Sequence, residues 1–361
     1  MDNVNHAVLE ISPYQPGKPI EELERERGIV GAIKLASNEN PRGPSKAVRE
    51  AIRKATDDLS RYPDGSAYRL RNLVASRLGV EPAQLTFGNG SDEALKIVGR
   101  VVLSPGDRGL VDERCFVVYP LTILGCNAEP VRVPSNGWAH NLEAIADAID
   151  ERTRIIYLAN PNNPTGTWFS EGDFRTFMKR VPSRVWVVLD EAYHEYARNV
   201  DGYPDGVSLL PEFPNLVVTR TFSKIYGLAA LRVGYSVSSN EVAELMNRVR
   251  QPFNVNSVAL AAAEAALEDN DYINESLRLN QEGMKALEAG FDRLGIAYIP
   301  SIGNFISFEV GPRAPDVYDA LLNRGVVVRP IANYDMPNHL RVTVGLPEEN
   351  ERFLAALEAS L

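Results

Sequence analysis

Two short apolar runs in the middle of the chain end in polar side chains that could contact a ligand. Asp190 and Tyr193 follow the run 185–189, and Asn163 lies in the Pro/Asn/Gly-rich stretch 160–166 after another such run. In open α/β sheets, ligands bind outside the carboxyl ends of the strands. Taken singly, an Asp after a strand or a turn rich in Pro and Asn is more often structural. These residues are therefore candidates only as part of a larger set.

A third junction could hold a phosphate group. The predicted strand from Gln84 to Gly88 is followed by Asn89 and Gly90, after which Ser91 and Asp92 open a predicted helix. The exposed backbone N–H groups and the positive end of such a helix can bind an anion. The glycine spacing matches neither a P-loop nor a dinucleotide-binding fingerprint, so the sequence gives little support for nucleotide chemistry.

The fourth junction contributes an amine. Lys224 lies just beyond a predicted strand, with Thr221 and Ser223 before it and Arg232 eight positions after it. Alone, Lys224 would be interpreted as a surface lysine. Hydroxyl groups and a guanidinium are what the phosphate of a cofactor needs around it. A single ligand would account for the whole set.

The order of these motifs resembles that of the fold-type I aminotransferases, which use pyridoxal 5'-phosphate (PLP). More narrowly, the chain resembles the histidinol-phosphate aminotransferase family, nearly from end to end. The resemblance rests on the segments Ile11–Tyr14, Leu35–Pro41, Arg61–Asp64, Gly90–Glu93, Asn163–Gly166, Asp190–Tyr193, Ser223–Lys224, Leu231–Gly234 and Leu340–Gly345. So many motifs in the family's order make the resemblance specific.

The resemblance implies a role for each residue around the cofactor ring. Lys224 would hold PLP as a Schiff base and then carry the proton between the substrate α-carbon and C4' of the cofactor. Asp190 would pair with the pyridinium nitrogen and keep it protonated, so that the ring accepts electrons. Tyr193 and Asn163 would hydrogen-bond the phenolic oxygen of the ring. Phe116 occupies the position of the aromatic residue that stacks on the ring.

The resemblance also implies a phosphate site that is shared between two subunits. One contact would come from the neighbouring subunit, which would make a homodimer with shared active sites the functional unit. The residues expected to hold the phosphate are Ser91, Asp92, Thr221, Ser223 and Arg232, with Tyr62 of the neighbouring subunit.

Three further residues carry the expectation about the substrate. Arg341 matches the position that binds the α-carboxylate of glutamate, and Tyr14 and Arg329 match positions where the family adds phosphate contacts. The implied reaction passes the amino group of L-histidinol phosphate to 2-oxoglutarate, giving imidazole-acetol phosphate and glutamate. Two alternatives stay open: transamination of an aromatic or other amino acid in a specialised pathway, and decarboxylation of an amino-acid phosphate.

Two departures from the family pattern bear on the substrate pocket. Arg114-Cys115 stands just before Phe116, where the family has a Tyr-Ser or Pro-Thr pair, so we expect a charged residue next to the cofactor ring. Ala229-Ala230 stands in place of Ala-Gly and would add a methyl group near the phosphate side. Either change could reshape the pocket.

Composition argues against several other classes of protein. The chain has 361 residues, with 38 Lys and Arg against 48 Asp and Glu, which gives a net charge of −10. This charge opposes binding to nucleic acid and to anionic membranes. A PLP-binding regulator would need an added basic DNA-binding segment, and the sequence shows none. The expected partners are therefore small molecules: an amino donor and a 2-oxo acid.

Cysteine usage and the N-terminus indicate a location inside the cell. The two cysteines, Cys115 and Cys126, support neither a disulfide scaffold nor a zinc cluster, so we expect no metal and a reducing compartment, the cytoplasm. Residues 1–6 lack a basic stretch followed by an apolar run, and no segment approaches about 18 uninterrupted apolar residues. We expect neither export nor a membrane span.

Alternating strand and helix patterns predict an α/β fold. The expected strands are 84–88, 109–111, 130–133, 154–160, 185–190, 216–219 and 232–237, and residues 92–102 have helical spacing. Several of these runs are continuously apolar, as expected for a mostly parallel sheet with helices on both faces. From about residue 272 the pattern changes to a long polar helix, a strand near 302–310, a helix over 314–323, a strand near 340–345 and a terminal helix from residue 348.

The change of pattern suggests the domain organisation. Residues 1–35 would form an N-terminal arm and part of a small domain. Residues 36–270 would form the large PLP-binding domain, and residues 271–361 a small α+β domain.

Overall fold

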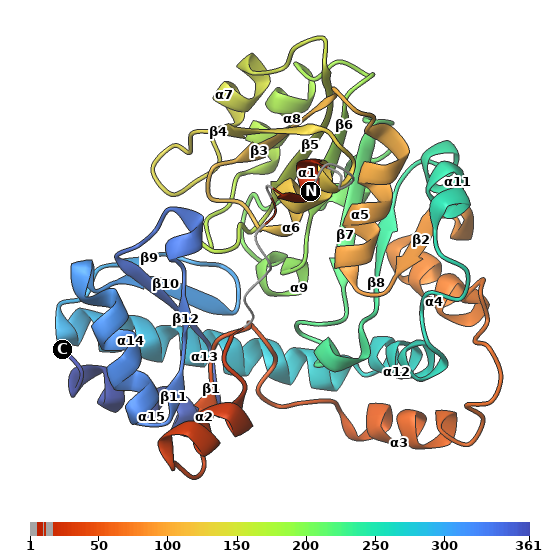
Figure 1. Ribbon diagram of the computed structural model, residues 1–361. Coiled ribbons are helices and arrows are strands. Elements are labelled where there is room, and N and C mark those ends of the chain that lie inside the picture. The colour runs from red at the N-terminus through yellow and green to blue at the C-terminus, as the bar shows by residue number, and fades with distance from the viewer. Residues whose placement is uncertain (1–5, 10, 12–16) are drawn as a thin grey trace.

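A computed structural model describes residues 6–9, 11 and 17–361 of the protein (Figure 1). A seven-stranded sheet forms the centre of its larger part. The strand order is β2-β8-β7-β6-β5-β3-β4. The strands are β2 (Leu85–Gly88), β3 (Arg108–Asp112), β4 (Glu129–Val133), β5 (Thr153–Ala159), β6 (Trp186–Asp190), β7 (Leu216–Thr221) and β8 (Gly234–Val237). Each strand predicted in this region is therefore present.

The sheet is mostly parallel, as predicted. Neighbouring strands from β4 to β7 are parallel, whereas β8 runs antiparallel to both β7 and β2. The reversal follows from the connection: the chain returns from β7 through the segment 222–233 without a crossover helix. The predicted start of β8 at Arg232 is two residues too early, because Arg232 adopts a left-handed conformation with φ of 55°.

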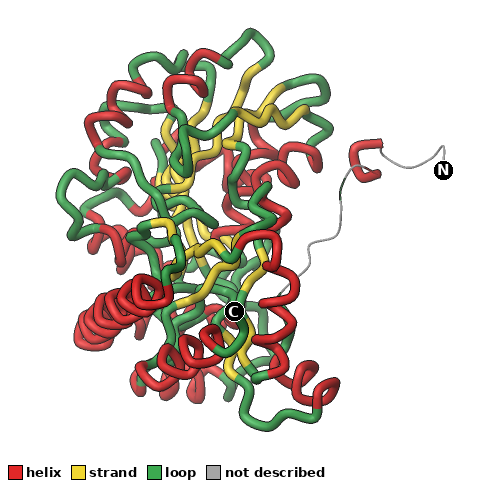
Figure 2. Tube along the Cα trace, turned by 90° about the vertical axis from the view of Figure 1, so that its left-hand side faces the viewer, coloured by secondary structure: helices red, strands yellow, loops and turns green. Residues whose placement is uncertain are grey.

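Helices cover both faces of this sheet (Figure 2). Side chains alternate along β5, so Ile156 and Leu158 pack into the hydrophobic cluster of one face while Ile155 and Tyr157 pack into that of the other. The first face is covered by α3 (Lys46–Ala55), α4 (Tyr68–Leu78), α8 (Glu171–Met178) and α12 (Ser257–Glu268), and the second by α5 (Ser91–Val102), α6 (Val118–Gly125) and α11 (Asn240–Val249). This double cover explains the continuously apolar strands.

The smaller part contains a four-stranded antiparallel sheet with the order β12-β13-β10-β9. Its strands are β9 (Tyr298–Ile299), β10 (Phe305–Glu309), β12 (Arg329–Pro330) and β13 (His339–Thr343), and its helices are α14 (Ala314–Asn323) and α15 (Pro347–Glu358). A two-stranded parallel sheet joins β1 (Ile33–Lys34) to β11 (Val326–Val327), and α2 (Ile20–Arg27) precedes it. The N-terminal segment therefore supplies a strand to this part.

The long helix α13 (Asn270–Leu294) runs between the two parts (Figure 1). Ile273 and Leu277, near its start, pack into the core of the large sheet, whereas Leu287 and Phe291 pack into the core of the small one. The boundary at residues 270 and 271 stays a prediction, because the helix contributes to both cores.

The remaining elements are short. They are α1 (His6–Leu9), α7 (Leu142–Asp147), α9 (His194–Ala197), α10 (Gly206–Leu209) and the 3-10 helices Pro82–Gln84, Ala229–Leu231, Gly311–Arg313 and Ala332–Tyr334. Over the residues described, no helix combines the length and apolar character that a membrane span requires.

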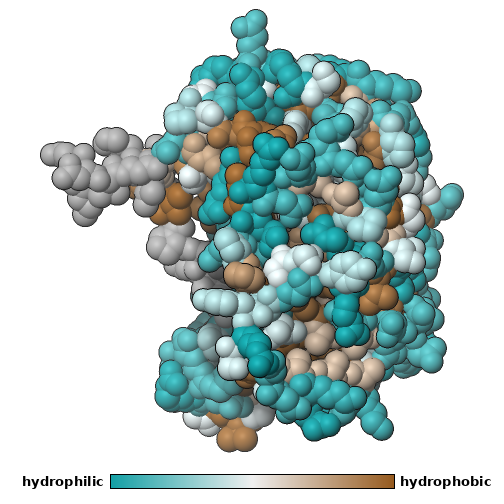
Figure 3. All heavy atoms as spheres, turned by 90° about the vertical axis from the view of Figure 1, so that its right-hand side faces the viewer, coloured by the Kyte–Doolittle hydropathy of each residue, from teal (hydrophilic) through white to brown (hydrophobic). Residues whose placement is uncertain are grey.

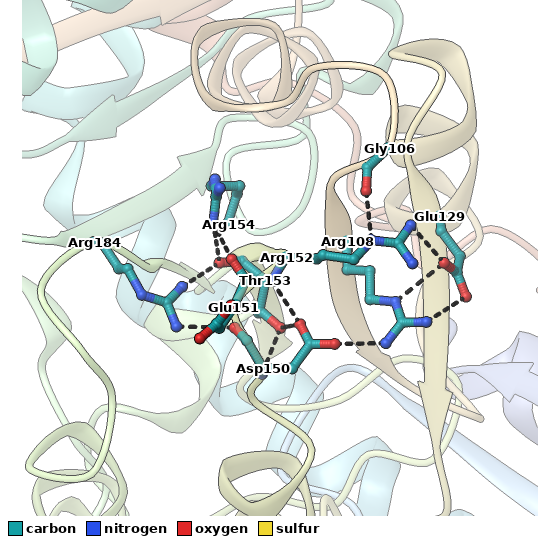
Figure 4. A network of polar contacts seen from close by, with 9 residues as sticks. All are labelled: Gly106, Arg108, Glu129, Asp150, Glu151, Arg152, Thr153, Arg154 and Arg184. Atoms are coloured by element: carbon teal, nitrogen blue, oxygen red, sulfur yellow. Dashed lines mark hydrogen bonds and ion pairs between the residues drawn. The ribbon is translucent and has the colours of Figure 1, made fainter.

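Hydrogen bonds from arginine side chains connect the amino ends of three parallel strands (Figure 4). Arg108 at the start of β3 donates hydrogen bonds to Glu129 at the start of β4 (3.0 Å) and to Asp150 before β5 (2.5 Å). Arg184 donates to the backbone carbonyls of Asp150 and Thr153, each at 2.9 Å. The carboxyl ends of these strands, at the opposite edge of the sheet, remain available for a ligand.

Candidate active site

A cavity of about 410 Å³ lies at the carboxyl ends of β5, β6 and β7. The loops after these strands, the start of α5 and the start of α6 form its wall. Its lining includes Ser91, Asp92, Phe116, Asn163, Asp190, Tyr193, Thr221, Ser223, Lys224 and Arg232. The fold therefore brings together, from five separate segments, the residues that the sequence predicted around one ligand.

Lys224 presents its amine to this cavity. The Nζ atom donates a hydrogen bond to the backbone carbonyl of Ser37 at 3.1 Å. Burial lowers the pKa of Lys224 to about 8, and the positive charge of Arg341 acts in the same direction. A larger fraction of the amine is therefore neutral near pH 7 than in an exposed lysine, and the neutral amine is the nucleophile and the base.

Asp190, the last residue of β6, is a buried carboxylate held by two hydroxyl groups. Its Oδ1 accepts a hydrogen bond from Thr219 (3.0 Å) and its Oδ2 accepts one from Tyr119 (2.8 Å). Burial raises the pKa of Asp190, because the charged form loses hydration. A cationic group of a ligand in the cavity would compensate for this cost. Tyr119 was not among the residues predicted from the sequence.

Tyr193 and Asn163 connect the cavity to the smaller part of the protein. The hydroxyl of Tyr193 accepts a hydrogen bond from Nδ2 of Asn38 at 2.8 Å, and its ring packs edge-on against Phe305 of β10. Burial raises the pKa of Tyr193 to about 12, so the phenol is protonated at neutral pH. Asn163 accepts a hydrogen bond from Arg341 of β13. Both side chains are therefore oriented from across the boundary between the two sheets.

One end of the cavity is built to hold an anion. Helix α5 begins at Ser91, and its preceding residue, Gly90, has φ of 82°. A Cβ at Gly90 would stand 2.6 Å from Nη2 of Arg232, so only glycine lets the guanidinium approach the helix start. Arg232 also donates to Oγ of Ser223 at 3.4 Å. Helix N–H groups, hydroxyls and a guanidinium together are a phosphate-binding set.

Lys96 is a second lysine in the cavity wall that the sequence did not single out. It lies one helical turn beyond Asp92 on α5, and its Nζ is 2.6 Å from Oδ2 of Asp92. A lysine at i+4 from an aspartate on a helix is common, so its spacing gave no signal of a ligand site.

Arg341 and Arg329 face each other on β13 and β12. They are paired residues of the antiparallel register, and both are buried. Arg341 donates to the carbonyl oxygen of Ala36 at 2.9 Å as well as to Asn163, which lines the cavity. Arg341 therefore reaches the cavity wall through Asn163, and Arg329 lies beside it; neither residue lines the cavity directly.

Two predicted residues lie elsewhere. Tyr62 is 82% exposed, outside the cavity, and stacks on Phe253, which is 46% exposed, with ring centroids 4.8 Å apart. Both are among the large hydrophobic side chains that are exposed. Figure 3 shows one face of the molecule, on which patches of hydrophobic residues interrupt a mostly hydrophilic surface. Tyr14 lies outside the described residues.

The departures from the family pattern have different outcomes in space. The expectation of a charged residue next to the cofactor ring stays a prediction, but the Arg114 side chain does not line the cavity. Instead it pairs with Glu113, and its guanidinium lies 5.1 Å from the ring centroid of Trp138. The cation–π attraction to Trp138 favours this position of the guanidinium, outside the cavity. Ala230 is exposed in a 3-10 helix and likewise does not line the cavity.

A cluster of potential metal ligands on the other side of β6 and β7 surrounds the guanidinium of an arginine. Glu191, His194 and Asp205 place ligand atoms within 4.8 Å of one another. The guanidinium of Arg220 donates to Glu191 and to Asp205, each at 2.7 Å, and lies 3.2 Å from His194. Arg220 occupies the position that an ion would need.

Comparison of the sequence with known proteins identifies the family. Residues 30–357 match the family model for aminotransferase class I and II. Histidinol-phosphate aminotransferase 2 of Pseudomonas fluorescens is 55% identical over 352 residues, which cover 97% of this chain and 95% of the relative. The protein of the same name from Pseudomonas aeruginosa is 54% identical over 352 residues, with the same coverage of each chain.

Comparison of the fold agrees with the sequence. The crystal structure of histidinol-phosphate aminotransferase from Sinorhizobium meliloti in complex with pyridoxal-5'-phosphate superposes with a TM-score of 0.90 at 29% identity, covering 100% of this chain and 98% of that one. An aspartate aminotransferase from Thermus thermophilus shares the fold, with a TM-score of 0.86 at 21% identity and complete coverage of both chains. The chain therefore belongs to the class I and II aminotransferases and, within them, to the histidinol-phosphate aminotransferase family.

Proposed function

We propose that this protein uses PLP to transfer the amino group of L-histidinol phosphate to 2-oxoglutarate, giving imidazole-acetol phosphate and glutamate. Full-length relatives at 55% and 54% identity carry the corresponding name. The observation that carries the substrate is the buried pair Arg329 and Arg341 on adjacent strands. Two guanidinium groups match the two negative charges of a phosphate dianion, whereas a carboxylate needs only one guanidinium.

The residues around the cavity fit PLP. The start of α5 with Arg232 suits its phosphate, Asp190 suits a protonated ring nitrogen, and Lys224 suits its aldehyde. When bound, PLP supplies an electron sink for the negative charge that develops at the substrate α-carbon. The protein contributes attachment, orientation and proton transfer.

Lys224 is the residue we assign to attachment and proton transfer. Its amine donates a hydrogen bond to the carbonyl of Ser37, and burial lowers its pKa to about 8. The free amine of Lys224 would remove the proton from the substrate α-carbon and deliver it to C4' of the cofactor. Both positions belong to the same bound molecule, so one flexible lysine can serve them in turn.

Three side chains would set the electronic state of the ring. Asp190 would keep the proton on the pyridine nitrogen by pairing with it as an anion. Tyr193 and Asn163 would donate hydrogen bonds to the phenolic oxygen and favour its ionised form. Phe116, two residues before α6, would cover one face of the ring. Each of these residues lines the cavity.

The proposed phosphate site needs a second subunit. Ser91 and Asp92 would contribute backbone N–H groups, and Thr221, Ser223 and Arg232 would contribute side chains. Tyr62 is too exposed to serve its own chain's cavity, and its stacking on Phe253 presents two apolar rings to solvent. A homodimer would bury these rings and bring each Tyr62 to the neighbouring phosphate site.

The substrate would bind between the two sheets. Arg341 and Arg329 would hold the phosphate of histidinol phosphate, and Arg341 would hold the α-carboxylate when glutamate is bound. Tyr14 is proposed as a further phosphate contact from the family pattern alone. Because Arg341 also contacts Asn163, an anion bound to Arg341 would change the hydrogen bonding of Asn163 beside the ring.

We also propose that the enzyme works in the cytoplasm. Cys115 is buried and Cys126 half-buried, and both are free thiols. A reducing compartment keeps such thiols unpaired. Fractionation of cells that make the tagged protein should place it with cytoplasmic markers.

Steady-state turnover of four amino donors tests the proposed substrate. L-Histidinol phosphate should be favoured over L-histidinol in kcat/KM by at least about 100-fold, because the unphosphorylated analogue lacks the dianion that the two guanidinium groups are proposed to bind. L-Phenylalanine and L-tyrosine should also be poor donors. Faster turnover of either aromatic amino acid, or release of carbon dioxide without a keto product, would contradict the proposal.

A further inference from the structure

We propose that Tyr119 is a positioning residue, which holds the Asp190 carboxylate in the orientation and ionised state that the ring nitrogen of the cofactor requires. The inference rests on the proposed function, since it concerns the partner of that nitrogen. Tyr119 lines the cavity at the start of α6, three residues after Phe116.

The two oxygens of Asp190 each accept one hydroxyl hydrogen bond, and the donors come from different elements. Tyr119 of α6 donates to Oδ2 at 2.8 Å, and Thr219 of β7 donates to Oδ1 at 3.0 Å. Two donors on opposite oxygens fix the plane of the carboxylate. Because donation to a carboxylate favours its charged form, the pair opposes the effect of burial.

The ring of Tyr119 is held in place by its neighbours. It stacks on Tyr157 with centroids 5.1 Å apart and an interplanar angle of 7°, and Phe116 meets its edge at 5.7 Å. Tyr119 is fully buried, so its hydroxyl cannot turn to solvent. A change of the χ1 rotamer of Tyr119 would break both the stacking and the bond to Asp190.

A comparison with Tyr157 separates packing from positioning. Tyr157 is equally buried in the same stack, but its hydroxyl donates to the backbone carbonyl of Leu95 at 3.0 Å. A buried phenol can therefore be satisfied without an ionisable partner at this place in the core. Of these two tyrosines, Tyr119 donates to the carboxylate of Asp190 and Tyr157 does not, so loss of the two hydroxyls should have different consequences.

The matched variants Tyr119→Phe and Tyr157→Phe test the proposal. Without cofactor, the Asp190 carboxyl can be followed by infrared difference spectroscopy against Asp190→Asn, and Tyr119→Phe should raise its titration midpoint. With PLP, Tyr119→Phe should weaken cofactor binding and lower kcat, each by about tenfold as for loss of a hydrogen bond to a charged group, with little change in KM. Tyr157→Phe should leave the Asp190 titration unchanged.

Each result bears on the proposal. Equal Asp190 titration in Tyr119→Phe and wild type, or equal shifts in the two phenylalanine variants, would overturn it. If Tyr119→Phe does not fold, fluorotyrosine at position 119 keeps the ring, and its more acidic phenol should lower the Asp190 midpoint; an unchanged midpoint would again overturn the proposal. If the wild-type protein binds no PLP, the proposed function itself fails. If the wild-type enzyme is active but Tyr119→Phe leaves the titration midpoint of Asp190 unchanged, this inference alone is rejected.

Discussion

Arg341 of β13 donates a hydrogen bond to Oδ1 of Asn163, so a residue proposed to bind the substrate contacts one proposed to bind the cofactor. The turn that carries Asn163 is held from the same side, since Ser307 of β10 donates to the carbonyl of Pro164 at 2.6 Å. The small sheet thus positions part of the cofactor site. Substitution of Arg341 should therefore change the surroundings of the cofactor ring and the pKa of Lys224.

The first prediction concerns the pH at which PLP attaches. The neutral amine of Lys224 reacts, so the rate of PLP attachment to apo-protein should rise with pH through a midpoint near 8. The positive charge of Arg341 helps to lower the pKa of Lys224, so Arg341→Gln should move the midpoint upward. Stopped-flow absorbance over a pH series measures this. Arg329→Gln is the control and should shift the midpoint less; identical midpoints in all three proteins would contradict the account.

The second prediction concerns Asp190. Asp190→Asn keeps the shape of the side chain but removes the negative charge that would hold a proton on the ring nitrogen. We expect kcat for transamination to fall by about 10² to 10³-fold, the size of effect seen when one preorganised electrostatic contact is lost. Equilibrium dialysis should still detect PLP on the variant. Wild-type kcat in Asp190→Asn would show that this carboxylate does not serve the ring.

The third prediction separates the two arginines by substrate. Arg329→Gln should raise KM for histidinol phosphate by about 10-fold or more while changing KM for glutamate little, because only the phosphate is proposed to need both guanidinium groups. Arg341→Gln should raise KM for both donors. Exposed Arg132→Gln serves as the control and should change neither value. Equal effects of Arg329→Gln on the two donors would remove the structural support for the phosphate pair.

The fourth prediction concerns the second subunit. Phe253→Glu places a charge in the proposed dimer contact and should shift the protein toward monomers, with weaker PLP binding because Tyr62 no longer reaches the neighbouring site. Light scattering coupled to size exclusion measures the mass. Val30 is 93% exposed, and Val30→Glu is the control, expected to stay dimeric. A wild-type protein that is monomeric while fully active would contradict the shared site.

Much of the site was predictable because its residues lie at strand ends. Asp190, Asn163 and Lys224 each follow an apolar run, and carboxyl ends of parallel strands meet at one edge. The local pattern thus fixed their neighbourhood without knowledge of the whole fold. The antiparallel direction of β8 was not predictable in this way, because an apolar run has the same pattern in either direction.

Contacts between residues far apart in sequence were beyond the pattern. Tyr119 contacts Asp190 across 71 positions, and a tyrosine in an apolar helix is most often a packing residue. Ser37 reaches Lys224 through its backbone carbonyl, which any residue type would supply. The direction of the Arg114 side chain depends on Trp138, which no local spacing connects to it.

The attachment point of PLP is the most direct test of the whole account. Borohydride reduces the bond between PLP and its lysine to a stable amine, and mass spectrometry of the digested protein then identifies the modified residue. Lys96 lines the same cavity and is the internal control. We expect the phosphopyridoxyl group on Lys224 and none on Lys96; modification of Lys96 or of another lysine, or of no lysine, would contradict the assignment of Lys224.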